Sequence, residues 1–435
     1  MSDMLGDEMP DFLDAMDKTP INTGLRINTL KDGARESVLS ELSSYSPVPW
    51  CDDGYYISKS ELSGTHPYHM GGLIYFQEPS AMSTVCALPI NKGDFVLDLC
   101  AAPGGKATQV AGRLCGSGFL VANEIVKKRA DILSDNIKRL GIKNAVVTNE
   151  SPKNLENKFP HFFNKIIVDA PCSGEGMFRK EPQAVDCWSV EHTLSCADRQ
   201  RHILDSAMSM LRGGGYLVYS TCTFSPDENE KIVDYVLDTY KNIELCDIKS
   251  LTALSNGIIK CSKYENITYT KRIFPHKQNG EGHFVALFHN TDAKEDRNIK
   301  TAKANNNALY REFENKFLNT HLDGTFVTFG DNLYLMSENI DLNKLKVVSP
   351  GLYLGTLKKN RFEPSYALAL ALKKEDFKNT LDCSLDMINA YFKGETLKCG
   401  HNGWTALLYN GYPMGFGKAS GGVLKNHYPK WLRLM

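Results

Sequence analysis

Two cysteines stand in loops that follow β-rich runs of the sequence. Cys172 lies in the segment Asp169-Ala-Pro-Cys172-Ser-Gly-Glu-Gly, and Cys222 lies in Ser-Thr-Cys222-Thr-Phe, after the next such run. Cysteines that only pack fall more often within a strand or a helix, whereas a reactive thiol needs a partly open position. We therefore expect Cys172 and Cys222 to act on a ligand at the rim of a sheet, with Asp169 beside them.

A glycine turn suggests where a cofactor would bind. Residues 94–106, Asp-Phe-Val-Leu-Asp-Leu-Cys-Ala-Ala-Pro-Gly-Gly-Lys, have the pattern of a buried strand, a glycine turn and the start of a helix. In an open α/β sheet, ligands bind beyond the carboxyl ends of such strands. A phosphate loop would need glycine at Cys100 and a hydroxyl at Ala107, and Gly-x-Gly-x-x-Gly is also absent. A nucleoside triphosphate or a dinucleotide is therefore the weaker expectation.

Glu124 ends the second β-rich run, roughly where a Rossmann-like site contacts ribose hydroxyls. A carboxylate there favours an adenosine ligand without a 2′-phosphate. S-adenosylmethionine fits, because its methionine end can meet the glycine turn while its ribose meets Glu124. Taken alone, Glu124 is as well explained by a solvent-facing position at the end of a strand.

A carboxylate and two thiols near a sulfonium cofactor suit methylation of cytosine at carbon 5. Carbon 5 is a poor nucleophile until a thiolate adds to carbon 6. A carboxyl group at ring nitrogen 3 would stabilise that adduct by hydrogen bonding and proton donation. The carbon-5 proton must then leave before the thiolate can be eliminated. One cysteine for attack, one for release and Asp169 at the ring edge account for all three residues.

The elements that must position these residues alternate between strands and helices, which predicts an α/β domain with a doubly wound parallel sheet. The expected strands are Phe95–Cys100, Phe119–Ile125, Ala145–Asn149, Lys165–Ala170, Tyr216–Thr223 and a late one at Gly282–Phe288. The expected helices are Lys106–Leu114, Lys127–Leu140, Arg199–Leu211 and one that starts at Ser225, with Pro226 and Glu228 as start signals. The dipole of this last helix would favour a thiolate at Cys222.

The chain divides into several expected domains. Residues 1–90 read as an α+β module, 91–290 as the Rossmann-like domain, and 291–308 as a polar linker without periodicity. Two small units follow, at 309–384 and at 385–435, and the second is rich in glycine and aromatic residues.

Composition narrows the classes of protein. The net charge of -1 conceals an acidic excess in residues 1–83 and a basic excess in residues 341–435. This asymmetry is typical of a protein that binds nucleic acid, but it is equally well explained by two solvated faces. The longest clean apolar run, Tyr366–Leu372, is far shorter than a membrane span, and the acidic start differs from a signal peptide. We expect a cytosolic protein with twelve reduced cysteines. No Cys-x-x-Cys or His-Glu-x-x-His occurs, so no metal site is expected.

Three motifs resemble those of a known family. LDLCAAPGGK, DAPCSGEG and STCTFSPDENE look like the cofactor, release and nucleophile motifs of the Nol1/Nop2/Sun RNA cytosine-5 methyltransferases, and the whole chain resembles the bacterial RsmF-like branch. The resemblance implies that Cys222 is the nucleophile and that Cys172 assists release. It further implies a cofactor and base site made of Cys100, Ala101, Ala102, Pro103, Gly104, Gly105, Lys106, Glu124, Arg129, Glu150 and Asp169. Many relatives place an aspartate where this chain has Asn149-Glu150, so either residue could meet the adenine.

The resemblance extends beyond the catalytic motifs. Gly24-Leu-Arg26-Ile-Asn28 resembles an N-terminal RNA-binding segment, residues 72–80 resemble the segment that leads into the catalytic domain, and residues 272–284 resemble the last core motif. Residues 403–430 are similar to a PUA-like RNA-binding unit. The resemblance implies a monomer that acts on ribosomal RNA, with 16S as the first expectation. Arg179 and Lys180 would meet phosphate or form an ordinary solvated pair.

Other substrates and roles remain open at this point. DNA cytosine methyltransferases use a Pro-Cys nucleophile, which makes Cys172 a competitor of Cys222. Their Glu-Asn-Val tripeptide is absent, and a second thiol has no role in their scheme, so RNA is favoured over DNA. An unpaired target cytosine is also cheaper to unstack in RNA. The alternatives are a non-catalytic RNA-binding or assembly factor, or a methyltransferase acting on tRNA, 23S ribosomal RNA, DNA or protein.

Overall fold

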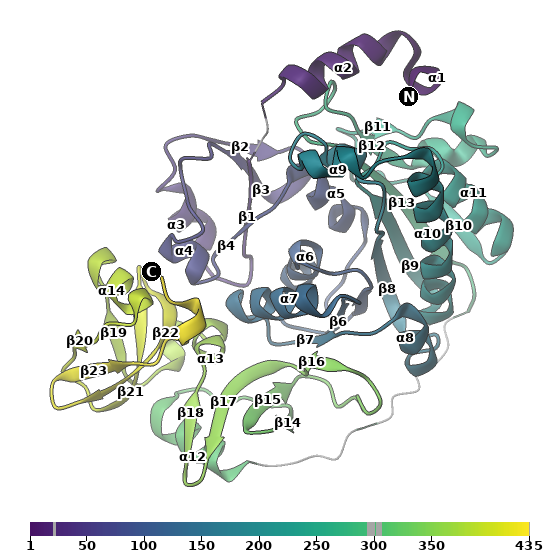
Figure 1. Ribbon diagram of the computed structural model, residues 1–435. Helices are drawn as coiled ribbons and strands as arrows, with labels where there is room; N and C mark the ends of the chain where they lie inside the picture. Colours follow the sequence, from purple (N-terminus) through teal and green to yellow (C-terminus); the bar gives the residue numbers. More distant parts are fainter. Residues whose placement is uncertain (21–22, 294–300, 302–306, 435) are drawn as a thin grey trace.

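The catalytic sheet dominates the computed structural model, which describes residues 1–20, 23–293, 301 and 307–434 (Figure 1). Most of the expected linker 291–308 lies outside the described residues. The five parallel strands, in spatial order, are β7 (Ala145–Thr148), β6 (Phe119–Asn123), β5 (Phe95–Asp98), β8 (Phe163–Asp169) and β9 (Leu211–Thr221). The chain moves outward from β5 in both directions, so the strand order reverses between β5 and β8. Ligands bind at such a switch point.

Antiparallel strands extend the catalytic sheet at both edges. Next to β9 lies β13 (His283–Asn290), which pairs with β12 (Lys271–Ile273) and with β10 (Ile243–Cys246), and β12 in turn pairs with β11 (Ser255–Asn256). At the other edge, β16 (Val347–Ser349) pairs with β7. The first C-terminal unit thereby adds a strand to the catalytic sheet.

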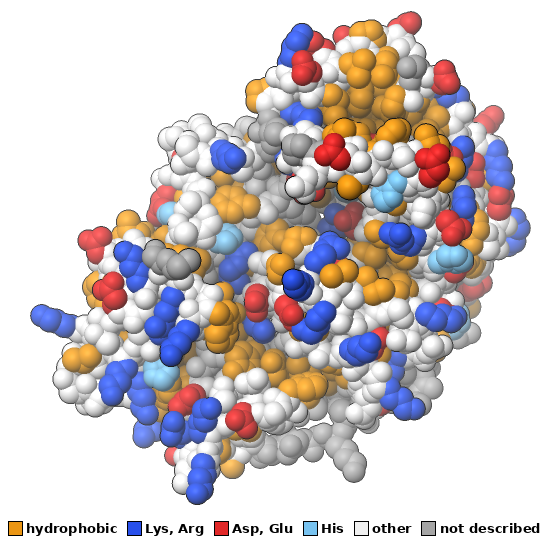
Figure 2. All heavy atoms as spheres, viewed as in Figure 1, with side chains coloured by type: hydrophobic (Ala, Val, Ile, Leu, Met, Phe, Trp, Pro, Cys, Tyr) orange, Lys and Arg blue, Asp and Glu red, His pale blue; other side chains and the backbone are white. Residues whose placement is uncertain are grey.

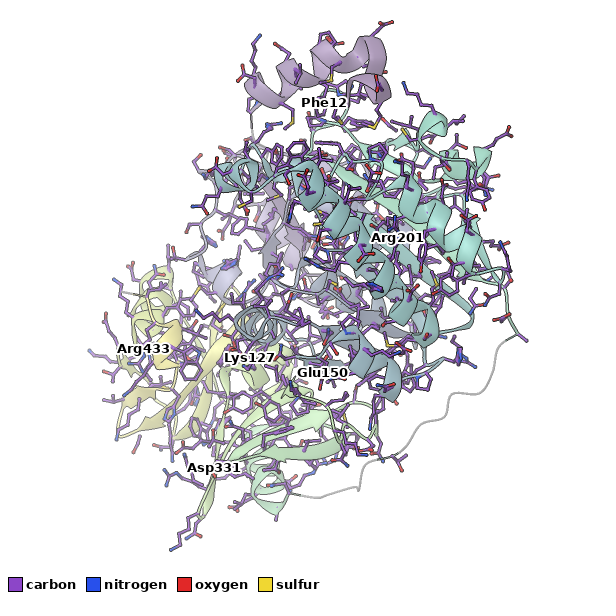
Figure 3. The ribbon with its side chains drawn as sticks, turned by 45° about the vertical axis from the view of Figure 1, so that its right-hand side comes forward. Phe12, Lys127, Glu150, Arg201, Asp331 and Arg433 are labelled. Atoms are coloured by element: carbon purple, nitrogen blue, oxygen red, sulfur yellow. The ribbon has the colours of Figure 1, made fainter. Side chains whose placement is uncertain are left out.

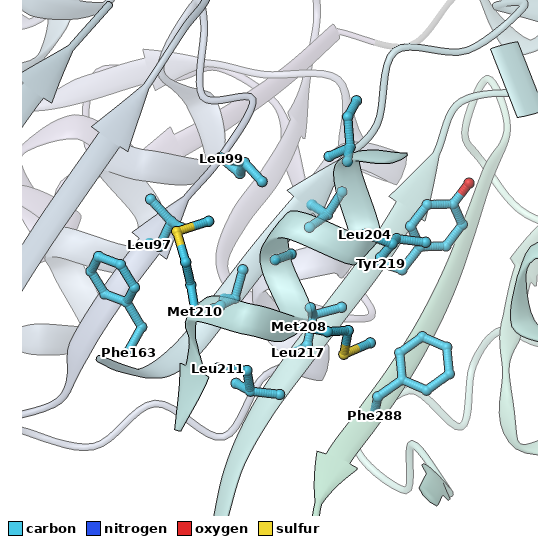
Figure 4. Packing of buried hydrophobic residues seen from close by; sticks show 14 of the residues in the cluster. Leu97, Leu99, Phe163, Leu204, Met208, Met210, Leu211, Leu217, Tyr219 and Phe288 are labelled. Carbon is cyan, nitrogen blue, oxygen red and sulfur yellow. The ribbon is translucent and has the colours of Figure 1, made fainter. Parts of the chain in front are cut away.

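Helices cover both faces of this sheet, which confirms the doubly wound α/β fold. One face packs under α8 (Pro152–Lys158), α10 (Val190–Met210) and α11 (Glu230–Thr239), and the other under α5 (Pro79–Ala87), α6 (Gly105–Leu114) and α7 (Lys127–Arg139). Because both faces are covered, the strands are apolar along their length rather than alternating. Figure 4 shows the first core, where Leu97 and Leu217 meet Leu204 and Met210.

The expectation that a helix starts at Ser225 is wrong, because α11 begins at Glu230. Residues 226–229 form turns instead. The Glu228 side chain does not return to the backbone of Ser225, since it is buried against Ser173 and Gln200. The helix therefore begins later in the sequence than expected, but its N-cap residue Asn229 is hydrogen-bonded to Thr221 and Thr223, on either side of Cys222. Two further boundaries differ: α10 starts at Val190 rather than Arg199, and β9 starts at Leu211 rather than Tyr216.

The N-terminal module is an antiparallel sheet in the order β2 (Tyr45–Val48), β3 (Cys51–Ile57), β1 (Thr23–Ile27) and β4 (Ile74–Phe76). Two short helices, α3 (Ala34–Leu39) and α4 (Pro67–Met70), belong to it. The preceding helices α1 (Ser2–Leu5) and α2 (Met9–Lys18) pack instead on the catalytic domain, where Phe12 contacts Phe224 and Phe274.

Two small sheets form the C-terminal part. The first has the order β14 (Thr325–Phe329), β15 (Asn332–Met336), β17 (Leu352–Lys358) and β18 (Arg361–Pro364), with α12 (Ala308–Phe317) and α13 (Tyr366–Ala371). The second has the order β19 (Thr380–Asp382), β21 (Gly403–Tyr409), β22 (Tyr412–Ser420), β23 (Val423–Asn426) and β20 (Leu397–Lys398), with α14 (Leu385–Lys393). Because β19 pairs with β21, the boundary expected at residue 384 is too late.

The last unit shares a core with the N-terminal module. Leu25, Ile74 and Tyr68 lie in one buried cluster with Ile388 and Leu407. The apolar run that forms α13 is likewise buried inside the protein. No helix within the described residues is long and apolar enough to cross a membrane.

Candidate active site

The two loop cysteines meet at the end of the catalytic sheet. The Cys172 Sγ lies 3.3 Å from the Cys222 Sγ, and both side chains are partly buried. The hydrogen bond with Cys222, together with burial, raises the pKa of Cys172 well above its usual range. Cys172 is therefore a protonated thiol near neutral pH, and either sulfur of the pair could donate the hydrogen bond between them.

A buried carboxylate holds the loop around Cys172. Glu228 Oε2 accepts hydrogen bonds from the Ser173 amide at 3.0 Å and from Gln200 Nε2 at 2.8 Å, and Glu228 Oε1 accepts from the Ser173 hydroxyl. Gln200 Nε2 also donates to the carbonyl of Pro171 at 3.0 Å. Residues on both sides of Cys172 are thus fixed by one Glu228–Gln200 pair, and neither member of the pair is exposed. Burial raises the pKa of Glu228.

The same network reaches the Cys222 loop. The Ser173 hydroxyl lies 2.8 Å from that of Thr223, which donates to Glu175 at 2.9 Å. The amide of Gly176 donates to the carbonyl of Cys222 at 2.8 Å, and a Cβ added to Gly176 would lie 2.7 Å from that oxygen. Only a residue without a side chain allows this approach. The two loops are therefore bound to each other as well as to the sheet.

Lys106 and Asp169 form an ion pair beside the cysteines. Lys106 Nζ lies 2.7 Å from Asp169 Oδ2, and the Ser220 hydroxyl donates to Asp169 Oδ1 at 2.7 Å. Burial alone would raise the pKa of Asp169, but the Lys106 ammonium and the Ser220 hydroxyl bring it below its usual value. Asp169 is consequently a carboxylate near neutral pH. Burial would lower the pKa of Lys106, but the Asp169 charge outweighs burial and raises it, so Lys106 is an ammonium.

His283 completes this ion-pair cluster. Its Nε2 lies 3.8 Å from Asp169 Oδ1 and 3.0 Å from the Thr84 hydroxyl. Burial, reinforced by the Lys106 charge, lowers the pKa of His283 to about 3. The imidazole is neutral at physiological pH and leaves Lys106 as the cation that faces Asp169.

A cavity of about 1050 Å³ opens beyond the ends of β5, β6 and β8. Of the residues proposed from sequence, Cys100, Ala102, Glu124, Arg129, Asp169, Cys172 and Cys222 line it. Arg129 lies 3.2 Å from the Glu124 carboxylate and donates to the carbonyl of Ala102 at 2.9 Å, which ties the glycine turn to β6. Ala101, Pro103, Gly104 and Gly105 form the turn behind this wall, and Gly104 has a left-handed φ of 118° where α6 begins.

Glu150 does not line the cavity. Its carboxylate accepts hydrogen bonds from Asn154 Nδ2 at 2.8 Å and from the amide of Lys346 at 2.7 Å. Asn149 is also engaged, since its side chain donates to the carbonyls of Glu124 and Ile125. Ser151 lines the cavity at this point instead.

Three residues expected on an RNA-binding surface have structural partners. Arg26 is buried and donates to Gln77 and to the carbonyl of Gly105, while the buried Asn28 donates to the carbonyl of Leu140. These bonds fasten the N-terminal module to the catalytic domain. Arg179, which was expected to meet phosphate or to form a solvated pair, is instead buried: only 8% of its side chain is exposed, and it lies 3.4 Å from Glu281.

Sequence reasoning did not find five residues of this site: Ser173, Gln200, Ser220, Glu228 and His283. Ser173, Ser220 and Glu228 lie inside the quoted cysteine motifs, and His283 lies inside residues 272–284, so membership of these motifs was the available signal. Gln200 comes from a distant part of the chain, and no quoted motif includes it.

The strand order, the glycine turn after β5 and the carboxylates after β6 and β8 define a Rossmann-like methyltransferase of the class that uses S-adenosylmethionine. Four family models match, each by its description: the N-terminal domain of 16S rRNA methyltransferase RsmF at residues 1–79, 16S rRNA methyltransferase RsmB/F at 85–289, the RsmF first C-terminal domain at 312–372, and the methyltransferase RsmF PUA domain at 378–434. The chain belongs to the RsmF branch of the RsmB/F family of 16S rRNA methyltransferases.

Individual relatives cover nearly the whole chain. Ribosomal RNA small subunit methyltransferase F of Vibrio parahaemolyticus is 30% identical over 98% of this chain and 94% of the relative. The protein of the same name from Vibrio vulnificus is 31% identical over 98% and 93%. Among solved structures, a methyltransferase homologue from Pyrococcus horikoshii is 29% identical, with a TM-score of 0.58, over 66% of this chain and 92% of that one. NSun6 from the same organism, solved with SFG, has the same fold at 22% identity and a TM-score of 0.59, over 67% and 97%.

Proposed function

We propose that this protein transfers a methyl group from S-adenosylmethionine to carbon 5 of a cytosine in 16S ribosomal RNA. The observation that carries the proposal is the 3.3 Å contact between Cys172 and Cys222 beside the Lys106–Asp169 ion pair. One thiol is enough to add to a pyrimidine, whereas two adjacent thiols suit a reaction in which the adduct must also be released. Membership of a 16S rRNA methyltransferase family supports ribosomal RNA as the substrate.

The lining of the cavity fits the cofactor. Glu124 at the end of β6 suits ribose hydroxyls, Asp169 at the end of β8 suits the positively charged methionine end, and the turn at 101–105 allows close backbone approach. When bound, S-adenosylmethionine supplies the methyl group that carbon 5 of the cytosine accepts. Glu150 is not included among the holding residues because its carboxylate is already bonded to Asn154 and Lys346.

Cys222 is the proposed nucleophile. Its thiolate forms a bond to carbon 6 of the cytosine, and the ring electron pair moves toward carbon 5. The raised pKa of Cys172 supports this assignment, since the protonated Cys172 stabilises a thiolate on Cys222 by hydrogen bonding. A scheme in which Cys172 attacks would require a thiol with a raised pKa to ionise first.

Lys106 is the proposed donor at the pyrimidine ring. The sequence suggested that Asp169 donates a proton at nitrogen 3, but the lowered pKa of Asp169 favours its carboxylate form. The Lys106 ammonium can donate at the ring edge, while Asp169 orients it and can accept from the exocyclic amine.

Cys172 is the proposed base for release. The neighbouring Cys222 sulfur is the main cause of its raised pKa, and that cause disappears once Cys222 is bonded to carbon 6. Cys172 can then lose its proton to water and, as a thiolate, take the carbon-5 proton. The electron pair of that C–H bond restores the ring double bond, and the Cys222–carbon 6 bond breaks.

Single-cysteine variants test this assignment. Cys222→Ala should lose methyl transfer to 16S RNA, while Cys172→Ala should accumulate an RNA adduct that survives denaturing electrophoresis. Cys187→Ala, which removes an exposed thiol, serves as the matched control. Bisulfite sequencing of the RNA locates any 5-methylcytosine. Turnover by Cys222→Ala, or methylation found only at another atom or in another substrate, would refute the proposal.

A further inference from the structure

A second hollow lies where the catalytic domain meets the C-terminal units. It has a volume of about 600 Å³ and is lined by α7, by β16 with the residue before it, and by η6 (Lys430–Leu432). Trp431 of η6 stands in its wall with 75% of its surface exposed, whereas Trp50 and Trp404 are each 5% exposed. An indole left this open has no packing role and offers a flat face for stacking.

The hollow is rich in groups that bind nucleotides. Lys127 and Lys138 line it from α7, and the exposed Lys346 lines it from the first C-terminal unit. The two helix lysines pair with Asp131 and Asp135 over one helical turn, and such pairs contribute only about 0.5 kcal/mol. They can therefore exchange these partners for a phosphate, and the freed carboxylates can accept from a base amine or a ribose hydroxyl.

This hollow adjoins the catalytic cavity. Ile125 and Val126 line the cavity and are 63% and 48% exposed, and the next residue, Lys127, lines the hollow. On the neighbouring strand, Asn149 lines the hollow while Ser151 lines the cavity. Figure 3 labels Lys127 at the start of α7 and Glu150 after β7, the two segments that form this junction. Lys and Arg side chains gather over the C-terminal units on the face shown in Figure 2.

We propose that this hollow binds one unpaired nucleotide of the RNA substrate, with its base stacked on Trp431 and its phosphates beside Lys127 and Lys346. The inference rests on the proposed function and names a second contact, outside the catalytic cavity, for the same RNA strand. Stacking on an aromatic ring tolerates any base, so the site anchors the strand without reading its sequence. A basic and aromatic hollow of this kind suits RNA better than an apolar protein segment.

Kinetic analysis of two tryptophan variants tests the site. Trp431→Ala should raise the KM for 16S RNA by about 5- to 100-fold, the range expected for one stacked base, with kcat unchanged. Trp431→Phe should retain most of the affinity. Phe329→Ala, which removes an aromatic ring that is 44% exposed on β14, is the matched control and should not change KM.

Two binding measurements do not depend on turnover. RNA should quench tryptophan fluorescence in the wild type, and most of that quenching should vanish in Trp431→Phe. Lys346→Ala should reduce the slope of log affinity against log salt by about 0.7, the value for one phosphate of a single strand.

The outcomes separate this proposal from the proposed function. A wild type that methylates 16S RNA, together with a Trp431→Ala variant of unchanged KM and unchanged RNA binding, would overturn the site alone. If Trp431→Ala bound assembled subunits more weakly but bound naked RNA as the wild type does, the site would also be overturned, because Trp431 would then contact a protein. A wild type that methylates no RNA would refute the proposed function itself.

Discussion

Glu228 illustrates how one residue can support a reaction without touching the substrate. Its carboxylate accepts three hydrogen bonds, from the Ser173 amide, the Ser173 hydroxyl and Gln200. It is fully buried, so these donors would lose an acceptor that water cannot readily replace. Through Ser173 and Pro171 it sets the position of Cys172, and through Thr223 it reaches the Cys222 loop. We regard Glu228 as a positioning residue.

Replacing Glu228 by glutamine should slow catalysis more than it unfolds the protein. The introduced amide would place a donor against the donors of Ser173 or Gln200, at a cost of about 1–3 kcal/mol. We expect kcat to fall at least about tenfold with little change in KM, and the pH profile of iodoacetamide labelling at Cys172 and Cys222 to shift. Glu265→Gln, at an exposed carboxylate, is the control. An unchanged labelling profile would contradict the positioning role.

The sequence predicted some of these residues and not others for a physical reason. Cys172 and Cys222 could be predicted because each directly follows a β-rich run, within a motif that can be read from local sequence. Glu228 was interpreted as a helix-start signal because Ser225-Pro-Asp-Glu228 matches that pattern, and local sequence does not reveal that a distant Ser173 competes for the same carboxylate. The electrostatic state of Asp169 likewise depends on Lys106 and Ser220, which come from separate elements.

At the scale of elements, the N-terminal helix α2 supports the loop that carries Cys222. Phe12 is 5% exposed, and its ring lies 5.0 Å from that of Phe224, two residues after Cys222. Lys277 and His276 hold the preceding Glu8. From sequence, residues 1–90 were expected to form one module, because local sequence does not show against which surface a helix packs.

Phe12→Ala should therefore loosen the Cys222 loop. Truncating a buried phenylalanine lowers the free energy of unfolding by about 3–5 kcal/mol. Here the lost packing lies between α2 and the segment after Cys222. We expect faster hydrogen exchange in residues 222–228 and a lower kcat. Leu13→Ala, at a neighbouring side chain that is 53% exposed, should leave both unchanged. Equal exchange in the two variants would contradict this support.

The strand β16 gives Glu150 a role that differs from the one inferred from sequence. Glu150→Ala removes the acceptor for the Lys346 amide, so the β16–β7 junction should open more often. Limited proteolysis near residues 343–349 should become faster, while the Kd for S-adenosylmethionine should change less than about threefold. A large loss of cofactor affinity without faster proteolysis would instead place Glu150 at the adenine.

At the scale of the whole molecule, the buried His283 and the partly buried His69 link stability to pH. Burial lowers the pKa of His283 to about 3 and that of His69 to about 4, against about 6.5 in the unfolded chain. Between these values the unfolded chain binds more protons, so the free energy of unfolding falls on acidification. The contribution is fully present above about pH 6.5 and is lost as the pH falls toward 4.

Thermal unfolding from pH 7.5 to 4.5 checks this linkage. Each histidine contributes a slope of up to about 1.4 kcal/mol per pH unit. His69→Gln should make the fall in Tm with acid shallower than in the wild type. If both proteins lose Tm in parallel, carboxylates and not His69 govern the acid limit.

The doubly wound sheet could be predicted because its strands are continuous apolar runs that alternate with helices. The contacts among the domains could not, because they depend on pairing between residues hundreds of positions apart, such as Lys346 with Asn149 and Tyr68 with Asn410. Two of the boundaries that shifted, at Ser225 and at residue 384, lie where a distant partner decides the local structure.

The shared core of the first and last modules has a consequence for biosynthesis. Leu25 and Ile74 emerge early from the ribosome, while Ile388 and Leu407, which cover them, are among the last residues to be made. The N-terminal module must therefore wait with part of its apolar surface open to water, within reach of chaperones, until translation is nearly complete. A nascent chain interrupted before β19 would keep that surface exposed, which would mark it for degradation.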